Sequence, residues 1–242
     1  MHPPDVPAET ALRRTMVDLC HRLHAQGLLV ALDGNLSARL PSGHILCTKA
    51  GTHKAFVQDT DLVVTDAEGQ WLRGLGKPTS ELALHLACYK SRPDINAIIH
   101  AHPPSAIACT LAGVDLDRPL LPEVVLTLGT VPTVPYATTG SKALALATAA
   151  VAVHRDGILL DKHGAVALGT TLIDAFCHLE TIEQLARITL DASALGPVPS
   201  LPHSEAVRLR SAGLKRYGGP PASVVLADQP NADLRPSSDG SS

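Results

Sequence analysis

Hydrophobic residues along the chain follow two spacings, one typical of helices and one typical of strands. The helical spacing first appears near the N-terminus, with apolar residues at Leu12, Met16, Leu19 and Leu23. Gly27 gives that helix a C-terminal stop. Further helices are expected after a cap at Thr79, from Pro103-Pro104, at 140–154 and at 174–190.

Short apolar runs bounded by turn residues predict strands between these helices. The runs lie at 28–31, 45–48, 62–65, 71–73, 96–102, 124–128, 131–134 and 157–169, the last being two strands joined by a turn. Turn residues stand at Asp33-Gly34-Asn35 and at 66–70. Strands joined by so few residues must pair antiparallel, because a parallel crossover needs a dozen residues or more. The pattern predicts a single α/β domain with helices on both faces of a sheet.

Composition narrows the class of protein and its partners. Of the 242 residues 45% are hydrophobic but only 2% aromatic, so we expect a core of Leu, Val, Ile and Ala. The formal charge of −3 gives no electrostatic reason to expect nucleic acid or a membrane as partner. The longest apolar run, 143–153, is too short to span a bilayer, and the N-terminus has no signal-peptide pattern. Five scattered cysteines favour free thiols in a reducing, cytoplasmic setting.

Three segments differ in composition and predict the domain boundaries. Residues 1–7 contain three prolines and are expected to form a flexible arm. Residues 8–217 are expected to form one folded domain. Residues 218–242 are dominated by Gly, Pro, Ser, Asp and Asn, which predicts a disordered tail.

The most informative chemical pattern is Ile98-Ile99-His100-Ala101-His102-Pro103. Residues i and i+2 of a strand point to the same face, so His100 and His102 are placed to bind one metal ion. The alternative is a surface pair of histidines without a ligand role. His163 precedes a glycine at the turn between two strands, and Glu81 stands in the predicted first turn of a helix, where a carboxylate is favoured. A solvated histidine and a dipole partner are the alternatives for these two residues.

Five blocks of sequence together resemble the class II aldolase/adducin family. They are Gly34-Asn35-Leu36-Ser37, Thr48-Lys49-Ala50-Gly51, Pro78-Thr79-Ser80-Glu81, His100-Ala101-His102 and His163-Gly164, over about residues 10–195. The resemblance is strongest to the fuculose-phosphate aldolase type. It implies an αβα layered domain with a mainly antiparallel central sheet, and a homotetramer with active sites between subunits.

The same resemblance implies roles for individual residues. His100, His102 and His163 would bind a divalent ion, most often zinc but with Mn²⁺, Co²⁺ or Fe²⁺ as alternatives, and Glu81 would be both ligand and base. Asn35, Gly51, Thr79 and Ser80 would bind a substrate phosphate. Free N–H groups of a turn and of a helix start suit a phosphate. A turn and a helix cap are the plain structural alternatives for Asn35 and Thr79.

The chain also departs from the fuculose type. Lys49 and Ala50 replace a proline and a hydroxyl residue in the phosphate cradle. The loop tyrosine that serves as proton donor has no clear match, and Glu123 stands in the corresponding region. Tyr217 matches a second family tyrosine near the C-terminus, although a tyrosine at a helix end is often only a packing residue.

The resemblance implies reversible cleavage of a ketose 1-phosphate to dihydroxyacetone phosphate and an aldehyde, with Glu123 or Tyr217 as donor on the aldehyde side. Epimerases, dehydratases and keto-acid decarboxylases of the same fold are alternatives. The epimerases carry Asp where this chain has Glu81. A non-catalytic adducin-like interaction domain is a further alternative, but that branch lacks the metal histidines.

Overall fold

The structure, a computed structural model, describes residues 6–217, with side chains from residue 8 onward. One eight-stranded sheet runs through it in the order β4-β3-β2-β1-β5-β8-β7-β6. Its strands are β1 (Asn35–Arg39), β2 (Ile45–Thr48), β3 (Leu62–Thr65), β4 (Trp71–Arg73), β5 (Ala97–Ala101), β6 (Thr133–Val134), β7 (Gly157–Leu160) and β8 (Gly164–Gly169). Neighbouring strands pair antiparallel except β6 and β7, which are parallel. This confirms the predicted α/β fold with a mainly antiparallel sheet.

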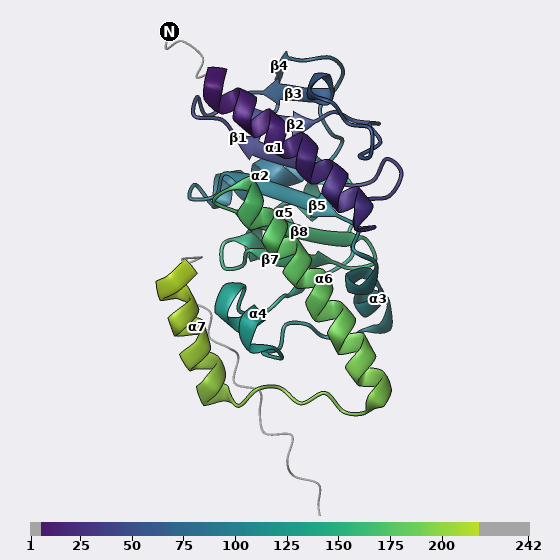
Figure 1. Ribbon diagram of the computed structural model, residues 1–242, viewed down its shortest axis with the longest axis vertical. Coiled ribbons are helices and arrows are strands. Elements are labelled where there is room, and N and C mark those ends of the chain that lie inside the picture. The colour runs from purple at the N-terminus through teal and green to yellow at the C-terminus, as the bar shows by residue number, and fades with distance from the viewer. Residues whose placement is uncertain (1–5, 218–242) are drawn as a thin grey trace, which may run out of the picture.

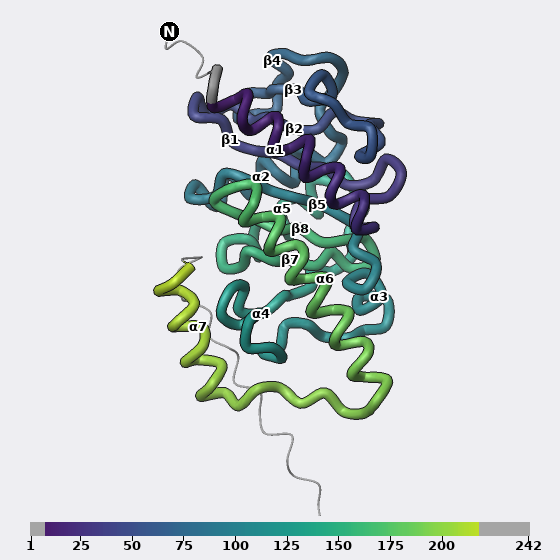
Figure 2. Tube along the Cα trace, in the orientation of Figure 1, coloured from purple at the N-terminus to yellow at the C-terminus, as the bar shows by residue number. Residues whose placement is uncertain are grey.

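Helices cover both faces of the sheet (Figure 1). One face packs against α1 (Val6–Ala25), α3 (Pro104–Ala112), α4 (Pro122–Thr127) and α6 (Leu172–Leu195). The other face packs against α2 (Leu82–Ser91) and α5 (Lys142–Ala152). A short 3-10 turn, η1 (Asp59–Asp61), precedes β3, and α7 (His203–Tyr217) lies beside α4. The chain between α6 and α7 runs along one end of the molecule (Figure 2).

The alternation of side chains along β5 decides which layer the functional residues face. All five residues of β5 are buried. Ile99 joins the core beneath α1 and α6, whereas Ile98 joins the core beneath α2 and α5. Because alternate residues of a strand share a face, His100 lies on the α2 side with Ile98.

Several predicted elements are confirmed. The strands predicted at 45–48 and 62–65 are β2 and β3, β3 forms the predicted hairpin with β4, and β7 forms the other predicted hairpin with β8. The helix expected at Pro103-Pro104 begins at Pro104. The five cysteines are free, and all except Cys177 are buried.

The prediction of a strand at 28–31 is wrong, as is the placing of Asn35 in a turn. The chain instead curves between α1 and β1, with Ala31 and Gly34 in the left-handed region, and the Leu28 carbonyl accepts the His102 N–H. Asn35 begins β1. Gly34 is required there, because a Cβ would lie 2.7 Å from the His100 carbonyl oxygen.

The prediction of a strand at 124–128 is also wrong, because this run belongs to α4. Pro122 occupies the first turn of the helix, where a proline is favoured. Val124 and Leu128 lie four residues apart and reach the same core. α7 packs closely on α4, since a Cβ on Gly213 would lie 1.8 Å from the Leu126 carbonyl oxygen.

Most other boundaries shift by one or two residues, but α6 ends at Leu195 rather than at the predicted residue 190. α1 begins at Val6, inside the predicted arm, and α5 and β6 are shorter than expected. The tail predicted at 218–242 and residues 1–5 of the arm lie outside the described residues.

Candidate metal centre

Three strand ends meet at one edge of the sheet and bring the predicted ligands together. Asn35, the first residue of β1, lies opposite His100 in β5. β8 begins at Gly164, directly after His163, and Ala165 pairs with Ala101. His102, the residue directly after β5, therefore lies beside His163.

The three histidines present nitrogen atoms that lie within 4.8 Å of one another. His102 Nε2 is 3.2 Å from His100 Nε2. Two ligands of one tetrahedral zinc ion, each about 2.0–2.1 Å from the metal, are about 3.3–3.4 Å apart. The observed spacing therefore fits a shared ion.

Glu81 supplies a carboxylate to the same group. Its Oε2 is 3.1 Å from His100 Nε2, and its Oε1 is 3.5 Å from His163 Nε2. Oε1 is buried and has no hydrogen-bond partner, and neither has His163 Nδ1. Buried polar atoms rarely lack a partner, so this cluster has the character of a ligand site. Three imidazoles and a carboxylate are a donor set that suits a divalent first-row metal.

Glu81 lies just before α2 rather than in its first turn, which corrects the prediction. Glu81 is itself the N-cap residue, and the helix begins at Leu82. The predicted cap Thr79 lies outside the helix, and its N–H donates to the Thr48 carbonyl. Thr79 Oγ1 accepts the Glu81 N–H at 3.4 Å instead. This path of the chain ahead of α2 places the Glu81 carboxylate next to His100 of β5.

Electrostatics keep this site ready to bind a cation. Burial alone raises the pKa of Glu81, but hydrogen bonds from His100 and Asn35 and the charge on His100 outweigh it and hold the pKa well below its usual range. Burial and the neighbouring His100 lower the pKa of His163 to about 4. Burial likewise lowers the pKa of His102. At neutral pH Glu81 is therefore an ionised carboxylate, and His102 and His163 are neutral imidazoles, the forms that bind metals.

Contacts behind the cluster fix the orientation of the rings. His100 Nδ1 lies 3.0 Å from the Ala165 carbonyl oxygen, which directs Nε2 toward Glu81. His102 Nδ1 lies 3.5 Å from an oxygen of Asp33. Gly164 leaves room for both rings, because a Cβ there would lie 2.9 Å from His102 and 3.1 Å from His100.

A buried network under the cluster was missed in the sequence. His85 Nδ1 lies 2.6 Å from Ser37 Oγ, which lies 2.9 Å from the Tyr89 hydroxyl. Burial lowers the pKa of His85 to about 3. The available signal was the four-residue spacing of His85 and Tyr89, which places both on one side of α2, the helix that follows Glu81. The network anchors α2, and hence Glu81, to β1.

The predicted phosphate residues line the same cleft as the metal ligands. This cleft of about 510 Å³ is bounded by Asn35, Gly51, Thr79, Ser80, Glu81, His102 and His163. Asn35 Nδ2 donates to Glu81 Oε2 at 3.0 Å, so Asn35 supports the carboxylate as well. Lys49 also lines the cleft, but its ammonium is 2.5 Å from Asp61. Lys54 and Asp33 complete the wall, and neither was predicted.

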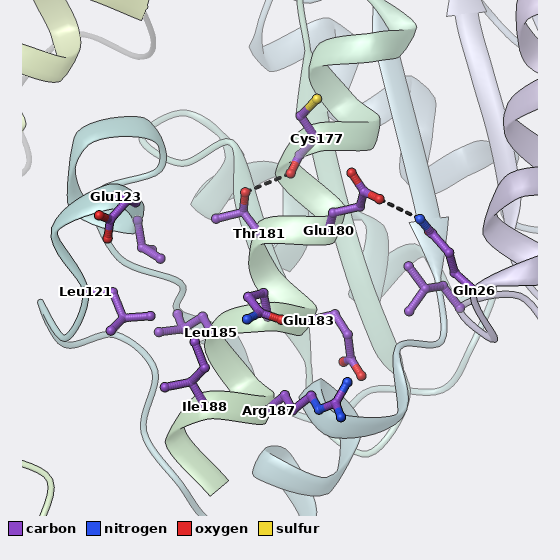
Figure 3. A pocket seen from close by; sticks show the side chains of 13 residues that line it. Gln26, Leu121, Glu123, Cys177, Glu180, Thr181, Glu183, Leu185, Arg187 and Ile188 are labelled. Atoms are coloured by element: carbon purple, nitrogen blue, oxygen red, sulfur yellow. Dashed lines mark hydrogen bonds between the residues drawn. The ribbon is translucent and has the colours of Figure 1, made fainter. Parts of the chain in front are cut away.

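The two predicted proton donors lie elsewhere in the chain. Glu123, on α4, lines a separate cavity of about 740 Å³ against α6, together with Leu121, Thr181 and Leu185 (Figure 3). Tyr217, at the end of α7, lines a third cavity with Arg92 and Asp156. Neither residue lines the cleft of the metal ligands within one chain.

Glu183 of α6 also lines the cavity in Figure 3 and has a clear structural role. Its two carboxylate oxygens accept the Ser105 and Ala106 N–H groups at 3.0 Å each. These N–H groups are the free donors at the start of α3. Glu183 therefore fixes the segment that directly follows His102 and Pro103.

Within residues 6–217, no helix is long and apolar enough to cross a membrane.

Known proteins are similar to this chain both in sequence and in fold. It is 34% identical over 210 residues to the 3-oxo-tetronate 4-phosphate decarboxylase of Escherichia coli, an alignment that covers 84% of this chain and 97% of that protein. It is 36% identical over 179 residues to the L-fuculose phosphate aldolase of Methanocaldococcus jannaschii, with 74% and 95% covered. The solved structure of YgbL from Klebsiella pneumoniae has a TM-score of 0.78 and 34% identity, with 84% and 99% covered.

The family assignment rests on most of the chain. Residues 14–190 match the Class II Aldolase and Adducin N-terminal domain, and these residues include every predicted metal ligand. The chain belongs to this family.

Proposed function

We propose that this protein is a metal-dependent lyase that breaks a carbon–carbon bond near the carbonyl group of a small phosphorylated substrate. One observation carries the proposal: three histidine nitrogens lie within 4.8 Å of one another, and two of these histidines contact the Glu81 carboxylate, in a cleft that Gly51, Thr79 and Ser80 also line. We expect the ion to be zinc. The arrangement disfavours the non-catalytic alternative, because a purely binding domain has no need of a buried metal-ligand set.

The residues of the cleft divide the chemical work. When bound, the divalent ion supplies Lewis acidity, which stabilises negative charge on substrate oxygens. His100, His102 and His163 hold that ion. Glu81 transfers the proton, and Asn35 holds its carboxylate in place by the 3.0 Å hydrogen bond. Thr79 and Ser80 hydroxyls and the N–H groups near Gly51 receive the phosphate.

Within this class, we propose decarboxylation of a phosphorylated 3-keto acid as the reaction. The bond to the carboxyl carbon breaks, CO₂ leaves, and the electron pair stays on the remaining fragment, which then takes one proton on carbon. This reaction needs no proton donor on the departing side. The separation of Glu123 and Tyr217 from the cleft supports it, as do relatives that align over almost their whole length.

Aldol cleavage is the second candidate and was the first expectation from the sequence. It leaves the same kind of electron-rich fragment but expels an aldehyde, which requires a further proton transfer. The likeness to L-fuculose phosphate aldolases supports it, including a solved structure with a TM-score of 0.78 and 29% identity. A cytoplasmic homotetramer is compatible with either reaction. Aldol cleavage in addition needs sites between subunits, because its proton donor, Glu123 or Tyr217, would have to come from a neighbouring subunit.

Product analysis distinguishes the two reactions. The metal-loaded protein is incubated with phosphorylated 3-keto acids and, separately, with ketose 1-phosphates. The reverse direction is tested with dihydroxyacetone phosphate and a panel of aldehydes. We expect release of CO₂ from a keto acid. Aldehyde release with no CO₂ would favour the aldolase, and turnover of only unphosphorylated sugars would overturn the proposal.

A further inference from the structure

Lys54 is a buried cation that the predicted catalytic set does not use. The residue is only 2% exposed, although it lines the cleft of the metal ligands. Its ammonium donates to the Thr52 carbonyl at 2.8 Å and to the Leu32 carbonyl at 3.3 Å. An ammonium group has three N–H donors, so one remains for a ligand.

No carboxylate neutralises Lys54 within the described part of the chain. Asp33 acts on Lys54 electrostatically but forms no ion pair with it, and the Asp33 carboxylate lies 3.5 Å from His102. Carbonyl oxygens accept hydrogen bonds but carry no net charge. A buried charge without a counter-ion is costly, and burial accordingly lowers the pKa of Lys54.

The position of Lys54 relative to the cleft indicates which anion would compensate it. Lys54 lies three residues after Gly51, on the loop that forms the predicted phosphate cradle. Lys49, the other lysine of this cleft, is already paired with Asp61. Among the described lining residues, Lys54 is thus the lysine whose charge is still available.

We propose that the Lys54 ammonium receives the phosphate group of the substrate and thereby determines the preference of this cleft for phosphorylated compounds. The inference rests on the proposed function, which supplies a phosphorylated substrate. It adds a charged contact to a cradle otherwise made of neutral hydroxyl, amide and N–H groups. A phosphate oxygen would take the third N–H, and the two carbonyls would keep the ammonium directed.

The alternative is that Lys54 only ties the Leu32 loop to the Thr52 loop. A structural tie would affect all ligands of the cleft alike, whereas a phosphate receptor affects only phosphorylated ones. The informative quantity is therefore the ratio of affinities for dihydroxyacetone phosphate and for dihydroxyacetone. The metal contributes to both affinities and cancels in this ratio.

The test compares the metal-loaded wild type with Lys54→Met and with the matched control Lys49→Met. We expect Lys54→Met to lower the ratio about tenfold or more, the usual value of a hydrogen bond to a charged group. Its KM for a phosphorylated substrate should rise more than its kcat falls. Lys49→Met should lower the ratio less, because Asp61 already neutralises Lys49. An unchanged ratio in Lys54→Met, or an equal loss in Lys49→Met, would overturn the inference.

Two further results separate this inference from the proposed function. If the wild type neither binds dihydroxyacetone phosphate nor turns over a phosphorylated substrate, both fail. If it does so and Lys54→Met is unchanged, only the role of Lys54 fails. Should Lys54→Met not fold, a crystal structure of the wild type with dihydroxyacetone phosphate decides. A phosphate oxygen within hydrogen-bond distance of Lys54 Nζ supports the inference, and a phosphate seated elsewhere overturns it.

Discussion

Two regions of this molecule carry residues that the sequence marked as functional, and they are built differently. At the ends of β5 and β8, the three predicted metal-binding histidines are buried or half-buried, come from a strand or its immediate flanks, and have nitrogen atoms within 4.8 Å of one another. Between α4, α6 and α7, Glu123 and Tyr217 occupy two separate cavities on helices. Strand register brings ligands together within one chain, whereas the helical region leaves these two residues away from the cleft.

The comparison separates two kinds of function. Metal binding needs ligand atoms held at fixed distances, and a sheet edge provides them without a partner. Proton delivery to a departing fragment needs only one correctly placed group, which a neighbouring subunit can supply. Substitution of a predicted metal ligand should therefore abolish or strongly lower activity. Substitution of Glu123 or Tyr217 should matter only for a reaction that needs a second acid.

The largest effect is expected from a change in the predicted metal ligands. Purified wild type should carry about one divalent ion per chain, and His102→Ala should lose both the ion and activity, because removal of one of three histidines leaves an incomplete ligand set. Metal content measured by elemental analysis checks this. His203→Ala is the control, since His203 is exposed at the start of α7. Full metal content in His102→Ala would show that the ligand assignment is wrong.

The next effect concerns Glu81, which touches two of the histidines. Glu81→Gln keeps the shape and a weak oxygen ligand but cannot accept a proton. We expect metal content to fall modestly and kcat to fall about 10²–10⁴-fold, the usual value of general acid–base catalysis.

Isotope exchange tests Glu81 without a complete reaction. Wild type should exchange a C3 proton of dihydroxyacetone phosphate with solvent, because that half-reaction needs only metal and base. Glu81→Gln should lose this exchange. Rapid exchange by the variant would leave Glu81 as a ligand or structural residue and place the base elsewhere.

The same contrast between regions explains what the sequence could predict. β2, β3 and β5 are apolar runs buried on both faces, so their pattern is local and clear. β1 was missed because Asn35 and Ser37 face the cleft and its buried network, and polar residues at these positions resemble a turn. The prediction of a strand at 124–128 is wrong because so short a run shows no clear period, and Pro122 favours the start of a helix.

The candidate site divides in the same way. His100 and His102 could be joined by strand periodicity alone. Their convergence with His163 and Glu81 depends on the register of β5 with β8 and on the hydrogen bond between Thr79 and Thr48 ahead of α2, which no local pattern encodes. Lys54 and Asp33 gave no signal, because the curved segment 26–34 that places Asp33 beside His102 was not predicted.

A smaller effect is expected in the pH dependence of stability of the metal-stripped protein. The pKa of His163 is lowered to about 4, below the value of about 6.5 in an unfolded chain. Between these values the unfolded chain binds more protons than the folded protein. The contribution of His163 to the free energy of unfolding is therefore full above about pH 6.5 and is lost as pH falls toward 4, by on the order of 1–3 kcal/mol. The free energy of unfolding, measured with urea, should depend less on pH in His163→Gln than in the wild type over this window. His203→Gln should keep the wild-type slope, and a His163→Gln slope equal to it would contradict the assignment.

The smallest effect is expected in the helical region and tests the comparison directly. If the reaction is decarboxylation, Glu123→Gln and Tyr217→Phe should each keep CO₂ release within about tenfold of wild type, below the usual value of a general acid. Steady-state assays of both variants on the same phosphorylated keto acid measure this. A loss of 10²–10⁴-fold in either variant would show that a second acid is used. Mixed oligomers of Glu81→Gln subunits and subunits of the inactive variant would then show which subunit supplies the second acid. Activity regained on mixing requires one site to combine Glu81 from one chain with the proton donor from another.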